Sequence, residues 1–422
     1  MKRLTRLPAS SLIATLILAL ILFISCSLLL SGLYYFKYFQ TRDTIDERLD
    51  DDLLSGINIV LSGNRFSENT YSDSLLLFKD SPDSLYYTSA LWGIFPGTTL
   101  RVAYKGRHKN KQFLSGAMQY PYADATLYLV DHDQPLSLVG ETLIEGKAYL
   151  PKSGIRSGFF EQRGFSREKI IEGVTDSSKK QLPTIAAAIQ NQVKAIAGFI
   201  KDSAANAAFV TGNALQSFSG DTRILKTNRW GILSNRTLSG RIIVVSDSVI
   251  EADRTSQLTD VILVAPFIHF KDGFAGAVQA FALDSITIDA GCYLKYPSAL
   301  VGMGRQDALS NTGATVTALD GSVVEGVIMA LAGTAGSNIK PVVKIKKGAA
   351  IKGLVYNNGY TYLNGKVEGA VFTDFFFEQR GPLSMENIII DASVTKSKWL
   401  TEAYYGAVFE TSSNRQIIKW LY

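Results

Sequence analysis

The sequence reads Val324-Glu325-Gly326-Val327-Ile328, then Ile351-Lys352-Gly353-Leu354-Val355, then Val367-Glu368-Gly369-Ala370-Val371. Each phrase places apolar residues around a central glycine, and similar phrases are centred on Gly146, Gly240, Asp260 and Gly276. The densest neighbouring copies begin 16 to 20 residues apart. Alternating apolar residues are typical of short strands, and Gly or Asp allows a sharp backbone turn between them. A repeat of this length predicts stacked coils rather than isolated hairpins.

The repeat therefore predicts a mainly β protein whose body, residues 236–422, is a right-handed parallel β-helix. The phrase around Gly146 predicts that residues 136–164 form the first coils of this solenoid. Stacking would bury a continuous apolar core that no single coil could form alone. An antiparallel sandwich would produce the same alternation of apolar and polar residues, and it stays open as the alternative.

The phrases at 324–328, 351–355 and 367–371 resemble the coils of bactofilins, the bacterial polymer-forming cytoskeletal proteins. The resemblance covers roughly residues 238–390. It implies a β-helix that can stack end to end and a scaffolding function without catalytic residues. The chain departs from that family in its greater length, its irregular coils and the additional segments before the body.

An apolar segment near the N-terminus predicts a membrane anchor over residues 1–36, with a short cytoplasmic start. No charged side chain lies between Leu7 and Phe36, and the 22 residues from Leu12 to Leu33 would span about 33 Å as a helix. We expect Leu12–Leu33 to contact membrane lipid. Basic residues precede this segment and a run of acidic residues follows it, so the N-terminus should stay in the cytoplasm. The body is then extracytoplasmic, and periplasmic in a Gram-negative cell.

Two other readings of the apolar segment stay open. A cleaved secretory signal has a similar basic start and apolar centre, but its apolar run is usually shorter. A lipoprotein signal cleaved before Cys26 is the second alternative, although the apolar run continues through Leu28-Leu29-Leu30. The other cysteine, Cys292, lies far away in the body and is expected to be a small buried residue.

Three further segments separate the anchor from the body. Residues 37–62 carry Ile45, Leu49, Leu53 and Ile57 at helical spacing, which predicts a juxtamembrane helix. Residues 63–135 alternate short Tyr- and Val-rich runs with turns, which predicts a small β region. Residues 165–235 are predicted to be a mainly helical insertion, because Ile185, Ile189, Val193 and Ile196 follow a helical period. The apolar face of this insertion would pack on the solenoid or bind a partner.

A hexapeptide, Phe-Phe-Glu-Gln-Arg-Gly, occurs identically at 159–164 and 376–381. One interpretation is an internal duplication in which two equivalent coil corners bury the Phe pairs. The other is a paired ligand site made of Glu161, Arg163, Glu378 and Arg380, because arginine offers a planar fork of donors to anionic or sugar ligands.

The sequence offers little support for catalysis. Its histidines and cysteines show no metal-ligand spacing, and Asp131-His132-Asp133 before Pro135 suits a polar turn. No phosphate-binding loop or nucleophile elbow is present, and no cofactor is expected. Exported β-helices are often polysaccharide lyases or hydrolases, and such chemistry would need clustered carboxylates. The candidates for such a cluster are Asp284, Asp289, Glu325, Glu368 and Glu378.

These observations predict a membrane-anchored, non-catalytic scaffold or interaction protein of the cell envelope, with envelope proteins or other copies of itself as partners. The alternative is a cell-surface carbohydrate-binding or carbohydrate-active protein, with a glycan as ligand. The net charge of +5 is small for 422 residues and no dense basic face recurs, so nucleic acid is not an expected partner.

Overall fold

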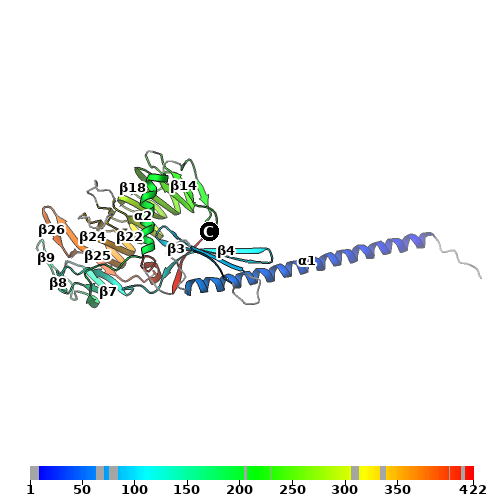
Figure 1. The fold of residues 1–422 in the computed structure, drawn as a ribbon, viewed down its shortest axis with the longest axis horizontal. Helices are drawn as coiled ribbons and strands as arrows, with labels where there is room; N and C mark the ends of the chain where they lie inside the picture. The colour runs from blue at the N-terminus through cyan, green and yellow to red at the C-terminus, as the bar shows by residue number, and fades with distance from the viewer. Residues whose placement is uncertain are drawn as a thin grey trace, which may run out of the picture. The chain divides into compact units, whose positions relative to one another are not determined.

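The computed structural model describes residues 9–62, 71–75, 84–203, 207–228, 230–305, 313–332, 339–398, 400–409 and 414–422. In these residues the chain is mainly β, with one long helix near the N-terminus (Figure 1). The chain divides into two compact units. The first contains Met1–Asn58, Ser74–Tyr86 and Leu100–Asn110, and the second contains Ile59–Asp73, Tyr87–Thr99 and Lys111–Tyr422.

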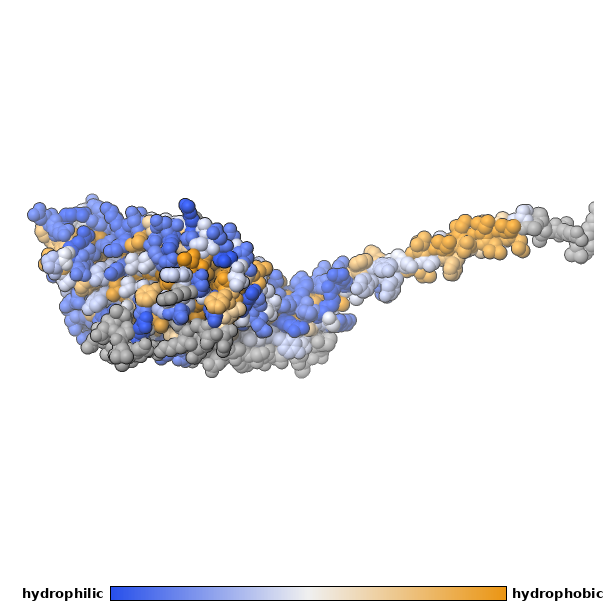
Figure 2. Space-filling view, turned by 90° about the horizontal axis from the view of Figure 1, so that it is seen from above, coloured by the Kyte–Doolittle hydropathy of each residue, from blue (hydrophilic) through white to orange (hydrophobic). Residues whose placement is uncertain are grey.

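Helix α1 (Ala9–Ser62) runs without a break through the predicted anchor and the predicted juxtamembrane helix. It is long and apolar enough to cross a membrane. The large apolar side chains between Leu12 and Phe39 are exposed, and Figure 2 shows the outer part of this helix as a hydrophobic surface. A helix that is apolar all round and has no protein neighbours is stable only in a lipid-like environment.

Farther along α1 one side of the helix is buried. Leu49, Leu53 and Ile57 are buried, as their four-residue spacing predicts. The same unit contains the start of strand β2 (Ser84–Trp92), the end of β3 (Phe95–Tyr104) and the start of β4 (Arg107–Ala117). Gly56 provides the space for close approach, because a Cβ there would lie 2.8 Å from Leu85 and 3.2 Å from Leu100.

Ion pairs flank this contact. The guanidinium of Arg107 lies 3.1 Å from the Asp46 carboxylate, and the Lys109 ammonium lies 2.7 Å from Asp50. The Arg48 guanidinium also lies 4.5 Å from the ring centre of Tyr104. The acidic residues that follow the apolar segment therefore bind the basic end of a β-hairpin.

We expect Gly56→Leu to separate α1 from the ends of β2 and β3, because the new side chain would overlap Leu85 and Leu100. In the full-length protein in detergent, amide hydrogen exchange at 84–86 and 100–110 should become faster. Gly32→Leu, in the same helix with nothing within 4 Å of the added Cβ, is the control for the helix propensity of leucine. Equal exchange in the two variants would contradict the contact.

The second unit is dominated by one set of hydrogen-bonded strands that pair in parallel, here called the parallel stack. Each pass of the chain pairs with the next: Val327 pairs with Leu354, and Leu354 with Ala370. Its strands from 208 to 395 are β12 (Ala208–Phe209), β13 (Ala214–Gln216), β14 (Arg223–Lys226), β15 (Thr237–Gly240), β16 (Ile242–Val245), β17 (Val249–Ala252), β18 (Gln257–Phe270), β19 (Ala275–Ile288), β20 (Tyr293–Gly302), β21 (Thr315–Ala318), β22 (Val323–Ala330), β23 (Val342–Ile345), β24 (Ala350–Leu363), β25 (Lys366–Arg380) and β28 (Ser393–Thr395).

The order of the stack differs from the order of the chain. Strands β5 (Ala125–Leu129) and β7 (Leu143–Leu150) pair with β25 and β28, and β11 (Glu172–Ser177) then pairs with β7. Strand β27 (Ile388–Ile390) likewise pairs with β6 (Leu136–Val139), and β6 with β8 (Ile155–Ser157). Residues 143–150 therefore join the parallel stack next to the C-terminal strand β28, not next to the strands that follow them in the sequence.

Two apolar clusters hold the stack together. Inside the coils, Val324, Ile328 and Val355 belong to a cluster that continues through the stack. Val327 and Leu354 point the other way and are buried in a second cluster under α2 (Ala187–Ser203) and α3 (Glu402–Tyr405). Figure 1 shows α2 lying across this covered face. The strands here are therefore apolar on both sides, which is typical of parallel sheets with both faces covered.

Residues 165–235 are not mainly helical as predicted. They contain α2, which has 17 residues, and the strands β11 to β14, so most of this segment is not helical. The helical period was correctly read, because Ile185, Ile189 and Val193 are buried against the parallel stack. The strands were missed because β12 to β14 have only two to four residues each, too few for alternation to be recognised.

Glycines form a column at the bend within the repeated phrase. Gly326 pairs with Gly353 and Gly353 with Gly369, and φ is 151° at Gly353 and 154° at Gly369. A Cβ on Gly353 would lie 1.9 Å from the carbonyl oxygen of Gly326. At the related position in β18, Asp260 has a φ of 61°. The phrase thus requires glycine, or a residue that tolerates positive φ, for both conformation and space.

Gly353→Ala should lower the free energy of unfolding by at least about 2 kcal/mol, because it combines a strained φ with overlap on the next coil. Gly212→Ala, where nothing lies within 4 Å of the added Cβ, should change it by less than about 0.5 kcal/mol. Urea unfolding of the two variants beside the wild type measures the difference. Equal stability of both variants would exclude the tight glycine column.

Candidate functional site

The first copy of the repeated hexapeptide forms a small exposed hairpin. Strands β9 (Phe159–Phe160) and β10 (Arg163–Gly164) pair antiparallel, with Glu161 and Gln162 as the two turn residues. Both turn residues have positive φ, 47° and 63°, as a type I′ turn requires. Phe159 is 74% exposed, so this Phe pair is not fully buried.

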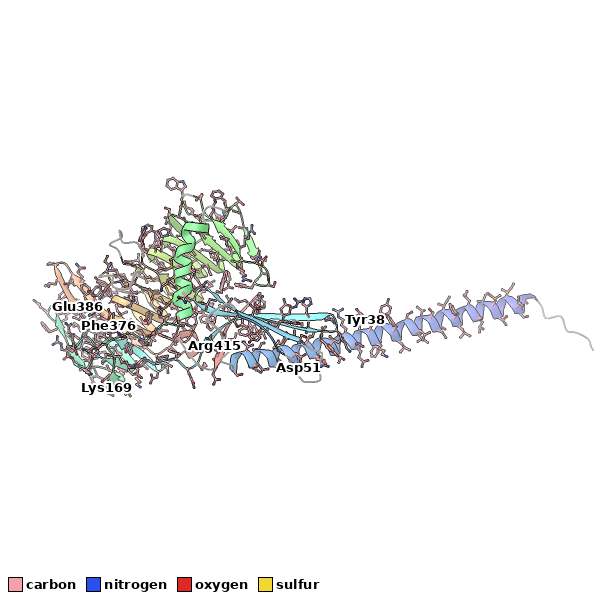
Figure 3. All side chains as sticks on the ribbon, viewed as in Figure 1. Tyr38, Asp51, Lys169, Phe376, Glu386 and Arg415 are labelled. Carbon is pink, nitrogen blue, oxygen red and sulfur yellow. The ribbon has the colours of Figure 1, made fainter. Side chains whose placement is uncertain are left out.

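The second copy lies mostly within a strand. Strand β25 continues through it and turns at Gly381 and Pro382 into β26 (Leu383–Glu386). Phe376 is fully buried, and Figure 3 shows it with Glu386 in this part of the molecule. The two copies are therefore not equivalent corners as the duplication interpretation predicted. In the second copy the turn therefore lies at the end of the hexapeptide, where Gly381 supplies the positive φ that a two-residue turn with Pro382 needs.

The four predicted ligand residues differ in their partners. Glu378 is buried; its carboxylate accepts hydrogen bonds from Arg380 Nε at 2.8 Å and from Asn364 Nδ2 at 3.0 Å. Arg163 instead binds the Asp391 carboxylate with two hydrogen bonds of 2.8 and 2.9 Å. Glu161 is exposed in its turn, and Arg163 is paired elsewhere.

The charges of the two copies nevertheless influence one another. The hydrogen bond that Arg380 donates to Glu378 raises the pKa of Arg380, and the charges of Glu161 and Asp391 raise it further. Burial alone would raise the pKa of Asp391, but hydrogen bonds from the Glu141 backbone N–H and from Arg163 lower it overall. The structure thus brings both hexapeptides into one charged region, where the carboxylate and guanidinium groups bind each other.

Sequence analysis missed an aromatic strip next to this region. Its members are Tyr360 and Tyr362 on β24 and Phe375 and Phe377 on β25. All four are half-buried, because they alternate with core residues and point outward. The ring centres of Tyr360 and Phe377 are 4.9 Å apart, and those of Tyr362 and Phe377 are 5.2 Å apart. Burial raises the pKa of both tyrosines.

At one end of the aromatic strip, the carboxylate of Asp374 bridges Lys340 and His132. Asp374 accepts from Lys340 Nζ at 2.6 Å and lies 2.7 Å from His132 Nε2. His132 also stacks on Phe375 with ring centres 4.0 Å apart, and the Lys340 ammonium lies 3.8 Å from the centre of the same ring. Asp133 N–H donates to Asp131, so this segment forms a turn. The pattern of outward aromatics on neighbouring coils could have been found by aligning the coils, but the partners of Asp374 come from distant sequence.

The strip belongs to an open face of the parallel stack. Outward positions pair from coil to coil, from Phe267 through Ser285 and Thr315 to Val342 and Tyr360. A second column runs beside it through His269, Thr287, Thr317, Lys344 and Tyr362. These side chains are half-buried or exposed, in contrast to the covered face under α2. The open face thus carries small hydroxyl residues between the pair Phe267 and His269 at one end and the aromatic strip at the other.

The carboxylates considered for lyase or hydrolase chemistry do not gather on this face. Asp284 binds Arg305, Asp289 lies 2.7 Å from His269, and Glu325 binds Lys352 at 3.1 Å. Among the described residues, no three His, Cys, Asp or Glu side chains are placed to hold a metal ion. Each of these three carboxylates has a cationic or imidazole partner.

A small cavity lies under α2. It measures about 230 Å³ and is lined mainly by apolar residues with Gln192, Thr222 and Arg241. Ligand pockets usually have volumes of about 300–1,000 Å³, so this cavity is smaller than a usual ligand pocket.

No protein-family model matches the sequence, and no curated protein matches it.

Arg380→Ala should destabilise the protein more than Arg163→Ala. Removing Arg380 leaves the buried Glu378 carboxylate with one partner, a loss of about 1–3 kcal/mol. The Arg163–Asp391 pair is more exposed and should contribute only about 0–1 kcal/mol. Urea unfolding measures both, and Arg380→Ala with Glu378→Gln should recover part of the loss. If the two single variants lose the same stability, the structural role of Glu378 is wrong.

Proposed function

We propose that this protein is a membrane-anchored, extracytoplasmic scaffold or interaction protein of the cell envelope. The observation that supports it best is α1, which is exposed and apolar over Leu12–Leu33 and continues into a helix packed on the first β-hairpin. Lys2, Arg3 and Arg6 favour a cytoplasmic N-terminus, which places the body outside, or in the periplasm of a Gram-negative cell.

We further propose that the parallel stack is a right-handed β-helix related in design to bactofilins. The parallel register, the glycine column and the phrases between 238 and 390 support this. Stacked coils give a rigid elongated surface whose outward positions can be varied without changing the core. Such a surface suits scaffolding and partner binding, with no catalytic residue required.

Carbohydrate binding is the second candidate function. The aromatic strip favours it, because half-exposed Tyr and Phe rings beside charged hydrogen-bonding groups are suited to sugar faces. Against it, both faces of the Phe375 ring are already occupied, by His132 and by the Lys340 ammonium. This ring is therefore less available for stacking, and the protein-binding role is the better supported of the two.

The orientation can be tested in spheroplasts. Added protease should digest residues beyond about 63 and leave the α1 segment in the membrane, because the body is outside. A cytoplasmic marker protein must stay intact in the same sample. Protection of the body until the membrane is permeabilised would mean that the orientation, and with it the envelope role, is wrong.

A further inference from the structure

The two ends of the parallel stack differ in chemistry. At one end, β11 pairs with β7, and its residues Glu172–Ser177 are all exposed and mostly polar or charged. At the other end, β12 pairs with β14 and β13 with β15. Among the described residues, no strand pairs with the outer edge of β12 or β13. Charged side chains on an edge strand normally prevent further pairing, and only the β11 end has them in the strand itself.

The β12–β13 end exposes large apolar side chains around its rim. Leu215 is 81% exposed, Trp230 70%, Phe209 55% and Ile232 49%. At the centre of this end, Val210 and Ala214 pack on the inner core but are only partly buried. Terminal coils of repeat proteins need a polar outer surface for solubility. This end has exposed polar residues such as Thr211 and Asn213, but its rim also carries the large apolar side chains above, which are suited to be covered by another chain.

The charged residues within 207–245 are mostly basic. In the described part of residues 207–245, the single acidic side chain is Asp221, and the basic ones are Arg223, Lys226, Arg236 and Arg241. Lys226 lies with its ammonium 4.7 Å from the ring centre of Phe209, beside the open strand. An incoming strand would therefore meet apolar contacts and positive potential together.

We propose that the β12–β13 end of the stack binds an extended segment of another envelope protein, which adds to it as a further strand. The segment alternates apolar with acidic side chains: its backbone pairs with β12 and β13, its apolar residues cover Val210 and Ala214, and its carboxylates meet the basic residues. Strand addition gives affinity through main-chain hydrogen bonds and specificity through alternate side chains. This inference deepens the proposed interaction role and names the class of partner.

Peptide binding to the full-length protein in detergent micelles tests the proposal. The probe is a labelled peptide of about seven residues that alternates Val with Glu, and its control alternates Val with Lys. Fluorescence anisotropy should show saturable binding of the acidic peptide only, weakened by salt. Leu215→Asp and Phe209→Asp should each weaken it at least about tenfold, because each removes an apolar contact and adds repulsion. Amides in 207–216 should exchange more slowly when the peptide is bound.

The matched control is Val174→Asp, because Val174 is a comparably exposed apolar residue, 64% accessible, on the opposite edge strand β11. It should leave the affinity unchanged, and melting curves should show all three variants folded. Equal binding of the two peptides, or equal loss in Val174→Asp, would overturn the proposal. Concentration-dependent oligomers that Leu215→Asp dissolves would overturn it too, since a second copy would then occupy this end. These outcomes do not depend on membrane orientation, which the protease experiment tests separately.

Discussion

The structure depends on the close approach of consecutive coils at the glycine column. Where Gly353 lies against the Gly326 carbonyl, there is no space for even one methyl group. This contact sets the register of the whole pass, because a shift by one residue would place a side chain against the neighbouring backbone and turn every core residue outward. Ile328 and Val355 can then stack inside the coils while Val327 and Leu354 face outward. The short glycine-centred phrase thus determines both the bend of the backbone and the direction in which the neighbouring side chains point.

The outward apolar column creates a second requirement, which the rest of the unit meets. Parallel strands that are apolar on both sides must be covered, and α2, α3 and the turn between β2 and β3 do so. Gln279 is a polar residue within this covered face, and both the oxygen and the nitrogen of its side-chain amide form hydrogen bonds. Its side chain accepts from the Ile94 N–H at 2.9 Å and donates to the Trp92 carbonyl at 2.8 Å. The hairpin turn is thereby held on the sheet without an unpaired buried amide.

Features that depend on local spacing could be predicted from the sequence. The length of α1, the buried side of its outer half and the bends at Gly353 and Gly369 follow from periodicity and from the φ values that only glycine tolerates. The stacking of β5 on β25 could not be predicted, because parallel pairing between distant segments leaves no mark on spacing. The two hexapeptides diverged for a similar reason, since the residues that follow each copy decide where the chain turns. Arg163 accordingly pairs with Asp391, which is far away in the sequence, and not with its neighbour Glu161.

The outer faces and the two ends of the stack are therefore under different constraints. The covered face is fixed by packing. On the open face, some polar side chains already bind one another, such as Asp374 with Lys340 and His132. At the β11 end, exposed charged residues oppose further strand pairing. The apolar rim at β12 and β13 is the one described surface where exposed side chains, an unpaired strand edge and an uncovered core coincide. In a rigid stack whose core is complete elsewhere, an exposed apolar surface of this kind is unfavourable in water. It is typical of a site that a partner covers.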